Sequence, residues 1–155
     1  MSRRVLVAVG ALLALVVAGT AAGIALALRD GGDDRLTSSE YLDRASALCQ
    51  RYARQLDRIT PPDLSSTTDV AASVGRALPV LRAQADAVRK LRPPQELEER
   101  VDRFFARTDR SLAALGAALD AARRGDRKAM APRLGDWIKS SAAAQTASKQ
   151  VGYRC

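Results

Sequence analysis

The sequence predicts an all-α protein, in which an N-terminal transmembrane helix is followed by an antiparallel, up-down four-helix bundle. Three observations lead to this prediction. An uncharged apolar run covers residues 5–28, four amphipathic segments with turns marked by Pro or Gly follow in residues 37–155, and aromatic residues make up only 4% of the chain. A core built mainly from Leu, Val and Ala is typical of helix bundles rather than of β-sandwiches or barrels.

The apolar run at residues 5–28 is long enough to cross a membrane. As a helix it extends roughly 36 Å at about 1.5 Å per residue, which exceeds a hydrocarbon core of about 30 Å. Arg3 and Arg4 precede it, so the positive-inside tendency keeps residues 1–4 cytoplasmic and places the rest of the chain outside. Residues 29–36 contain paired glycines and are expected to form a short flexible tether.

A cleaved signal peptide is the alternative interpretation of the same run. Its apolar region would cover residues 5–17, and cleavage would follow the small residues at 20–22. We favour the uncleaved anchor because the run continues past that site to Leu28, which an anchor needs and a signal peptide does not. If the leader is cleaved, the bundle is secreted.

The first predicted helix of the bundle covers residues 38–59. Thr37 and Glu40 fit a capping box at its start. Pro61 and Pro62 end it, because the residue before a proline is pushed out of the helical region. Its apolar face carries residues at steps of three and four: Tyr41, Ala45, Leu48, Tyr52, Leu56 and Ile59.

The second predicted helix covers residues 65–91 and contains a proline. Pro79 lacks the N–H that should bond the carbonyl of Gly75, so we expect either a kink or a break there. Pro93 and Pro94 follow the helix and close it. Its apolar side consists of Val70, Val74, Leu78, Leu81, Ala85, Val88 and Leu91.

The third and fourth predicted helices cover residues 94–124 and 126–151. Gly125 suits the end of the third helix, Asp126 can cap the fourth, and Pro132 is expected to distort the first turns of the fourth. The inward positions of the third helix are Leu97, Val101, Phe104, Thr108, Leu112, Leu115, Leu119 and Ala122, flanked by Phe105. Those of the fourth are Met130, Leu134, Trp137, Ser141, Ala144, Ser148 and Val151.

Small residues thin the apolar side of the fourth helix toward its C-terminus. Ser141, Ala144 and Ser148 are predicted to face large residues of other helices, such as Tyr41 and Leu97. One interpretation is a ligand groove at the membrane-proximal end of the bundle. The interpretation that we favour is a close approach of the helices over alanine, because protein interiors pack densely.

Cys49 and Cys155 are the two cysteines of the chain. The predicted topology puts both outside the cytoplasm, where disulfides persist. We therefore favour an intramolecular disulfide over an intermolecular bond or free thiols. Such a bond closes a loop of about 100 residues and would stabilise the fold by up to about 4–5 kcal/mol. Because Cys49 lies well inside the first helix, the chain end must turn back along that helix, or the helices must be staggered.

A stripe of four arginines follows the third helix: Arg100, Arg103, Arg107 and Arg110. The functional interpretation is a basic surface for an acidic envelope protein or an anionic polymer. The ordinary interpretation is a solvated helix face, supported by Glu96 and Glu99, which precede two of these arginines by one turn. We do not take the net charge of +8 as evidence for nucleic acid, because a GC-rich genome also produces a preference for arginine over lysine.

The sequence argues against enzymatic, metal and cofactor chemistry. It contains no histidine, which removes most catalytic and metal-binding constellations. Glu98 and Asp102 form a carboxylate pair, but carboxylate-bridged iron sites in bundles normally add a Glu-x-x-His motif. We therefore predict no catalytic residue, no metal ligand and no cofactor.

The layout of the chain combines an apolar leader, Cys49 in the first helix, a Leu-Arg-Pro-Pro turn at residues 91–94, Gly125 followed by Asp126, and a terminal Gly-Tyr-Arg-Cys at residues 152–155. In this layout it resembles small exported or membrane-anchored helical-bundle proteins of actinobacteria. The resemblance covers most of residues 36–155 and rests on the order of elements rather than on one motif. It implies a cell-envelope location and supplies no activity.

The predicted function is that of a non-enzymatic, membrane-anchored interaction module of the cell envelope. It would present a disulfide-stapled bundle outside the cytoplasm and bind a partner through the basic surface. The alternative is a ligand-binding or sensory bundle, anchored or secreted, with a groove beside the fourth helix.

Overall fold

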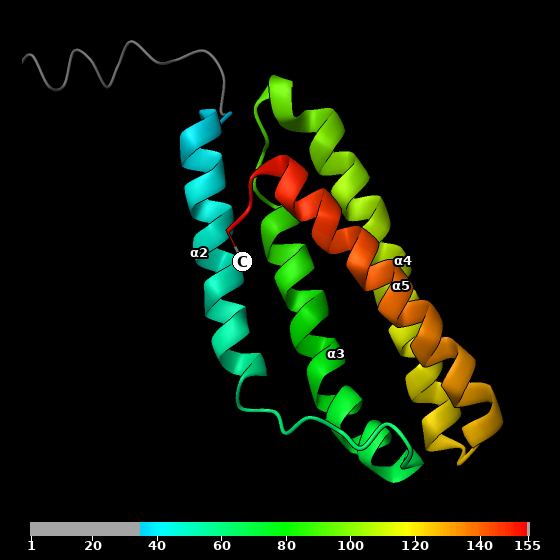
Figure 1. The fold of residues 1–155 in the computed structure, drawn as a ribbon. Coiled ribbons are helices and arrows are strands. Elements are labelled where there is room, and N and C mark those ends of the chain that lie inside the picture. The colour runs from blue at the N-terminus through cyan, green and yellow to red at the C-terminus, as the bar shows by residue number, and fades with distance from the viewer. Residues whose placement is uncertain (1–34, 155) are drawn as a thin grey trace, which may run out of the picture. The chain divides into compact units, whose positions relative to one another are not determined.

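The computed structural model describes residues 35–154, and this part of the chain contains helices and no strands. Its elements are α2 (Ser38–Leu56), α3 (Thr67–Arg89), the 3₁₀ turn η1 (Gln95–Leu97), α4 (Glu98–Arg123) and α5 (Arg127–Val151). Successive helices run in opposite directions (Figure 1), and the predicted all-α class is confirmed. The predicted transmembrane segment at residues 5–28 lies outside the described residues. Within residues 35–154, no helix has the length and apolar character needed to cross a membrane.

The helix N-termini form as the sequence predicts. Thr37 Oγ1 accepts a hydrogen bond from the backbone N–H of Glu40 at 3.3 Å, and the Glu40 carboxylate accepts one from the backbone N–H of Thr37 at 3.0 Å. This completes the predicted capping box. Ser66 and Asp126 cap α3 and α5, accepting from backbone N–H groups at 3.2 and 2.9 Å. Each such cap contributes about 1 kcal/mol to helix stability.

Two prolines lie inside helices without ending them. Pro79 is within α3, which continues to Arg89, and Pro132 is within α5, which begins at Arg127. The carbonyl that loses its bond to Pro79 belongs to Gly75, where a side chain is absent and the nearest neighbouring atom to a built Cβ is 3.8 Å away. By contrast, α2 ends at Leu56, before the predicted end at residue 59.

The core is divided into two clusters along the bundle. Cluster 1 lies at the end where α4 turns into α5: Val70, Val74, Leu78, Leu115, Ala118, Leu119, Ala121, Ala122, Met130 and Leu134. Cluster 2 lies at the end where α2 begins: Tyr41, Ala45, Val88, Leu97, Val101, Phe105, Val151 and Tyr153. Phe105 was predicted only to flank the core but is buried, whereas Phe104 is half-buried.

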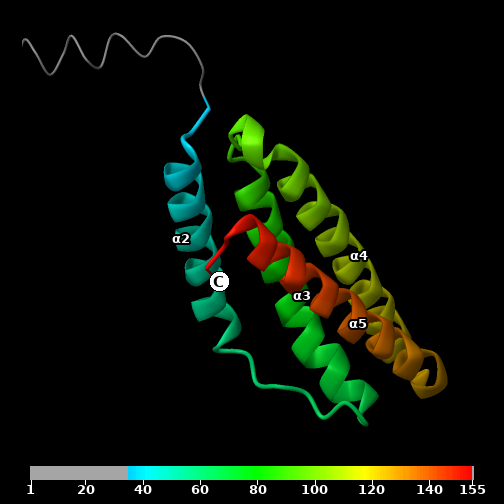
Figure 2. The ribbon, with the colours of Figure 1, turned by 45° about the horizontal axis from the view of Figure 1, so that its top comes forward.

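Each helix packs against the next one in the chain, and the most extensive contact is between α4 and α5. In both ribbon views α2 lies beside α3 and α5 lies along α4 (Figures 1 and 2). The end of α5 and the tail that follows it cross toward α2 (Figure 2). Consequently α2 and α5 approach each other at one end of the bundle rather than along their whole lengths.

The C-terminal tail turns back along α2. Gly152 makes the turn possible, because its φ of 101° lies in the left-handed region that favours glycine. The backbone N–H of Arg154 then donates to Ser46 Oγ at 3.1 Å. The chain end therefore makes the reversal that a bond between Cys49 and Cys155 requires, although Cys155 lies outside the described residues.

Replacing Gly135 with alanine is expected to stabilise the fold by about 0.5–1 kcal/mol, because glycine in a helix interior costs that much relative to alanine. Gly135 lies within α5, and a Cβ built there meets nothing within 4 Å. Urea denaturation of the full chain checks this expectation. The matched Gly152→Ala variant should instead be destabilised, because its φ of 101° is strained for alanine. A Gly135→Ala variant that unfolds at lower urea than wild type would contradict the helical packing described for α5.

Candidate binding groove

A groove of about 440 Å³ lies between the two core clusters. Residues of α3, α4 and α5 form most of its lining, and Cys49 of α2 and Tyr153 of the tail complete it. Its main apolar residues are Leu81, Val88, Phe104, Leu112, Trp137 and Ala144. Its neutral polar residues are Gln84, Thr108, Ser111, Ser141, Gln145 and Ser148. Among the described residues no Asp, Glu, Lys or Arg lines it, although the chain is 27% charged.

The small residues of α5 produce this groove. Ser141, Ala144 and Ser148 line it, while α5 also packs closely along α4, so the structure contains both the close helix approach that we favoured and a groove. The groove extends from these small residues to Leu81 and Gln84 of α3, and Cys49 is the described residue of α2 in its lining. Tyr41 and Leu97, which we expected opposite these residues, are buried in cluster 2 instead.

Thr108 has the one buried side-chain oxygen in the described part of the chain that lacks a hydrogen-bond partner. It lies on α4 between Phe104 and Leu112, one turn to either side, and all three residues line the groove. Most buried polar atoms are paired, and leaving one unpaired costs about 1–3 kcal/mol. The sequence predicted Thr108 as an inward position. It gave no signal of the missing partner, which depends on the neighbouring helices.

Two hydrogen-bonded phenols join the tail to α2 beside the groove. The hydroxyls of Tyr41 and Tyr153 are 2.5 Å apart, and the ring of Phe104 meets that of Tyr153 edge to face, with centroids 5.1 Å apart. Burial raises the pKa of Tyr41, although the hydrogen bond with Tyr153 partly opposes it. Burial, the hydrogen bond and the proximity of Tyr41 all raise the pKa of Tyr153. Both phenols are therefore neutral at physiological pH, and this end of the groove carries no charge.

The four arginines of the predicted basic surface have different surroundings. Arg100 and Arg107 donate to backbone carbonyls of α5, at 3.4 and 3.3 Å. Arg103 pairs with a glutamate one turn earlier on α4, and Arg110 is exposed. Two of the four guanidinium groups thus contribute to the packing of α4 on α5. The spacing of the arginines in the sequence did not indicate this role.

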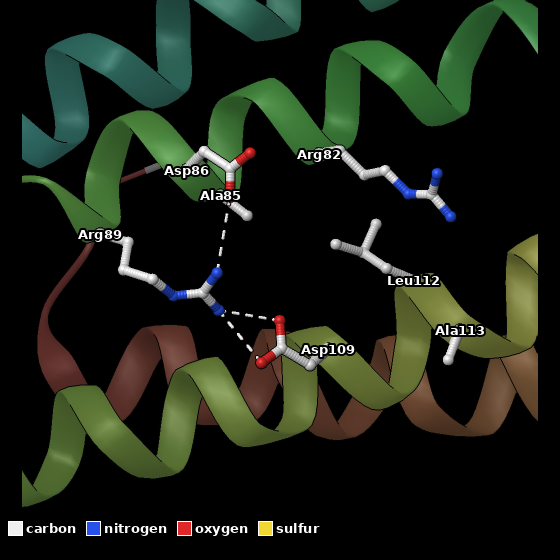
Figure 3. Close-up of a pocket in the computed structure, with 7 residues that line it drawn as sticks. All are labelled: Arg82, Ala85, Asp86, Arg89, Asp109, Leu112 and Ala113. Atoms are coloured by element: carbon white, nitrogen blue, oxygen red, sulfur yellow. Dashed lines mark hydrogen bonds and ion pairs between the residues drawn. The ribbon is translucent and has the colours of Figure 1, made fainter.

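A separate charged hollow lies between α3 and α4 (Figure 3). Arg89 donates to both carboxylate oxygens of Asp109, at 2.8 and 3.0 Å, and pairs with Asp86 at 3.5 Å. Its guanidinium carbon also lies 4.6 Å from the centroid of the Phe105 ring. Because Arg89 is matched by two carboxylates and an aromatic ring, we interpret it as a structural contact between the two helices.

The predicted carboxylate pair does not form a cluster. Glu98 pairs with Arg35 at 2.5 Å, and Asp102 is exposed. Within residues 35–154 no group of three or more potential ligand side chains could hold a metal ion.

No family model matches this chain, and neither a curated protein nor a solved structure matches it. The function therefore has to be inferred from the groove and from the sequence.

Proposed function

We propose that this protein is a non-enzymatic, membrane-anchored binding module of the cell envelope, and that its groove holds an elongated apolar ligand. The observation that carries the proposal is the uncharged groove between the two core clusters. Ligand pockets typically enclose about 300–1,000 Å³ and have mostly apolar walls with a few polar groups. The groove, with a volume of about 440 Å³, meets both conditions.

The groove is a better candidate than the basic surface of α4. Arg100 and Arg107 use their guanidinium groups to bridge α4 and α5, so a partner would have to compete with contacts inside the bundle. The groove requires no such exchange, since its polar lining residues among those described are neutral. Binding of an acidic partner to the basic surface stays a prediction.

The proposed ligand comes from the neighbouring membrane. The apolar run ends at Leu28 and α2 begins at Ser38. The residues between them, fully extended, reach only about 30 Å. An uncleaved anchor would therefore keep the bundle close to the bilayer, where apolar molecules are concentrated. If the leader is cleaved, the same groove would belong to a secreted carrier.

The lining of the groove offers the chemistry of binding rather than of catalysis. No imidazole, carboxylate or amine lines it. General acid–base catalysis at neutral pH needs a group whose pKa lies near the operating pH, and the pKa of Tyr153 is raised rather than lowered. The lining therefore supports a non-enzymatic role.

A disulfide between Cys49 and Cys155 is part of the proposal, because it would hold the tail against the groove. Cys49 is 4% exposed and lines the groove. Arg154 donates its backbone N–H to Ser46, one helical turn before Cys49, and its guanidinium pairs with Asp43 at 2.8 Å. These contacts bring the chain end beside the right turn of α2. A disulfide needs Cα atoms about 4.4–6.8 Å apart.

The Ala144→Phe variant is expected to bind an apolar probe at least tenfold more weakly than wild type, because the new ring fills the groove. Trp137 is the single tryptophan of the chain and lines the groove, so its fluorescence reports occupancy. The probe is 9,10-dibromooctadecane, whose bromine atoms quench tryptophan on contact. It is added to the full chain in phosphatidylcholine nanodiscs, and saturable quenching is expected for wild type.

The matched control is Ala142→Phe, which adds the same ring on the exposed side of α5 and should leave the quenching curve unchanged. Equal quenching in the two variants and wild type would mean that the probe reaches Trp137 from the bilayer and not through the groove. That result, or an absence of quenching in wild type, would overturn the proposed function.

A further inference from the structure

We infer that Thr108 selects, among apolar ligands, those that carry a neutral hydrogen-bonding group within the chain, such as an ester or amide flanked by hydrocarbon on both sides. The inference rests on the proposed function, because it names the ligand class of the same groove. It goes further in assigning one side chain as the determinant of specificity.

The first argument is the position of Thr108 along the groove. Phe104 and Leu112 line the groove one turn before and one turn after it on α4. Arg107 donates to the carbonyl of Ala143 at 3.3 Å, and this contact sets the register between α4 and α5. Residues near 108 on α4 therefore lie beside residues near 143 on α5.

The facing part of α5 contributes both polar and apolar residues to the groove. Ser141 and Gln145 lie on either side of this level, and Trp137 lies one turn beyond Ser141; all three line the groove. Tyr153 and Val88 also line the groove, and both belong to cluster 2. Neutral polar residues, Ser111 and Ser148 among them, therefore occur along the groove together with apolar ones, and Thr108 lies between Phe104 and Leu112.

The second argument is the missing partner of the Thr108 hydroxyl. The Ser141 hydroxyl donates to the carbonyl of Ile138 at 2.9 Å, whereas Thr108 Oγ1 is buried without a partner. Threonine in a helix populates two χ1 rotamers, and rotation from one to the other moves the hydroxyl to a new position and puts the methyl group in its place. A ligand carbonyl in the groove can accept the hydroxyl proton and so provide the partner that the bundle does not.

The third argument is the absence of charge from the lining. Burying an ionised carboxylate or phosphate without a counter-ion is strongly unfavourable, and no Lys or Arg of the described residues lines the groove. Fatty-acid carboxylates and phospholipid headgroups are therefore excluded from the section around Thr108. A neutral in-chain group satisfies both the hydroxyl and the uncharged walls.

The test compares two competitors that differ only in the polar group. Decyl octanoate and octadecane are each used to displace 9,10-dibromooctadecane from the full chain in nanodiscs, with Trp137 fluorescence as the readout. Wild type should bind the ester about tenfold more tightly than the hydrocarbon, the value of one hydrogen bond of ordinary strength. Thr108→Val should bind both equally, and Thr108→Ser should retain the preference.

The midpoint of thermal unfolding without ligand distinguishes this role from a purely structural one, because loss of a structural contact of Thr108 would lower the midpoint. Thr108→Val replaces an unpaired hydroxyl with a methyl group of similar size, so its unfolding midpoint should stay the same or rise. A lower midpoint, or equal binding of the two competitors to wild type, would overturn the inference. If wild type binds the two competitors equally but the bromine probe still quenches Trp137, the proposed function stands and only the inference about Thr108 fails. If the probe does not quench Trp137 at all, both the proposed function and the inference fail.

Discussion

The Cys155→Ala variant is expected to lose about 3–4 kcal/mol of unfolding free energy relative to the oxidised wild type. The proposed bond to Cys49 closes a loop of about 100 residues, and the chain-entropy model assigns a loop of that length up to about 4.7 kcal/mol. Arg154 already contacts α2 through Ser46 and Asp43, and one hydrogen bond with one exposed ion pair retains only a small part of the stabilisation. Urea denaturation of the full chain, with and without reductant, measures the difference.

The control is the Cys49→Ala variant, which breaks the same bond from the other side. Both variants should unfold at the same urea concentration, and reductant should shift wild type to their value while leaving the variants unchanged. Binding of the bromine probe should also weaken in both, because Tyr153 lines the groove and its position depends on the tail.

Two outcomes contradict the proposed bond. Alkylation of both thiols in the unreduced native protein would show that they are free. A dimer on a non-reducing gel that disappears with reductant would show an intermolecular bond, which the sequence analysis left open. In either case the tail would be held by Tyr153 and Arg154 alone.

The helix N-termini could be predicted from the sequence because their determinants are local. Thr37 and Glu40 lie within one turn of each other, and their reciprocal hydrogen bonds need no other helix. Ser66 and Asp126 are likewise caps that bond backbone groups of their own first turn. The spacing of apolar residues, three and four positions apart along the chain, then predicts which face of each helix is buried.

The groove could not be predicted because it depends on how the helices pair. The small residues of α5 fit either a close helix contact or a groove, and only the arrangement of α3, α4 and α5 shows that both are present. The same limit applies to Arg100 and Arg107, whose bonds to α5 carbonyls depend on the register of α4 against α5. The unpaired hydroxyl of Thr108 is a property of its surroundings, and no pattern in the sequence marks it.

Pro79 shows the same limit at the level of one residue. A proline in this position permits a kink or a break, and the rule for the isolated helix does not distinguish them. The structure has a continuous helix, in which Val74 and Leu78 before Pro79 and Val88 after it are all buried. A continuous α3 is what allows both clusters to use the same helix.

The stability of the fold is expected to decline steeply above about pH 10, because the two buried phenols keep their protons in the folded state. The pKa values of Tyr41 and Tyr153 are both raised from the ordinary value of 10.0. Below that value tyrosine is protonated in the folded and unfolded chains alike, and its contribution to stability is fully present. Above it the unfolded chain loses protons that the folded chain retains, so stability falls as pH rises toward the folded pKa.

The slope expected for each phenol is about 1.4 kcal/mol per pH unit in this range. Urea denaturation of wild type and of the Tyr41→Phe/Tyr153→Phe double variant between about pH 9 and pH 12 measures this slope. The comparison separates the contribution of the two phenols from that of the lysines and of the half-buried Tyr52, which both proteins share. Replacing both partners with apolar groups of the same shape is nearly neutral, so the two proteins should have similar stability at pH 8 and diverge above pH 10, with the double variant the more stable. Parallel curves would show that the phenols ionise as they do in the unfolded chain. The tail would then not be held in a dry contact with α2, and the end of the groove that Tyr153 lines would be open to water.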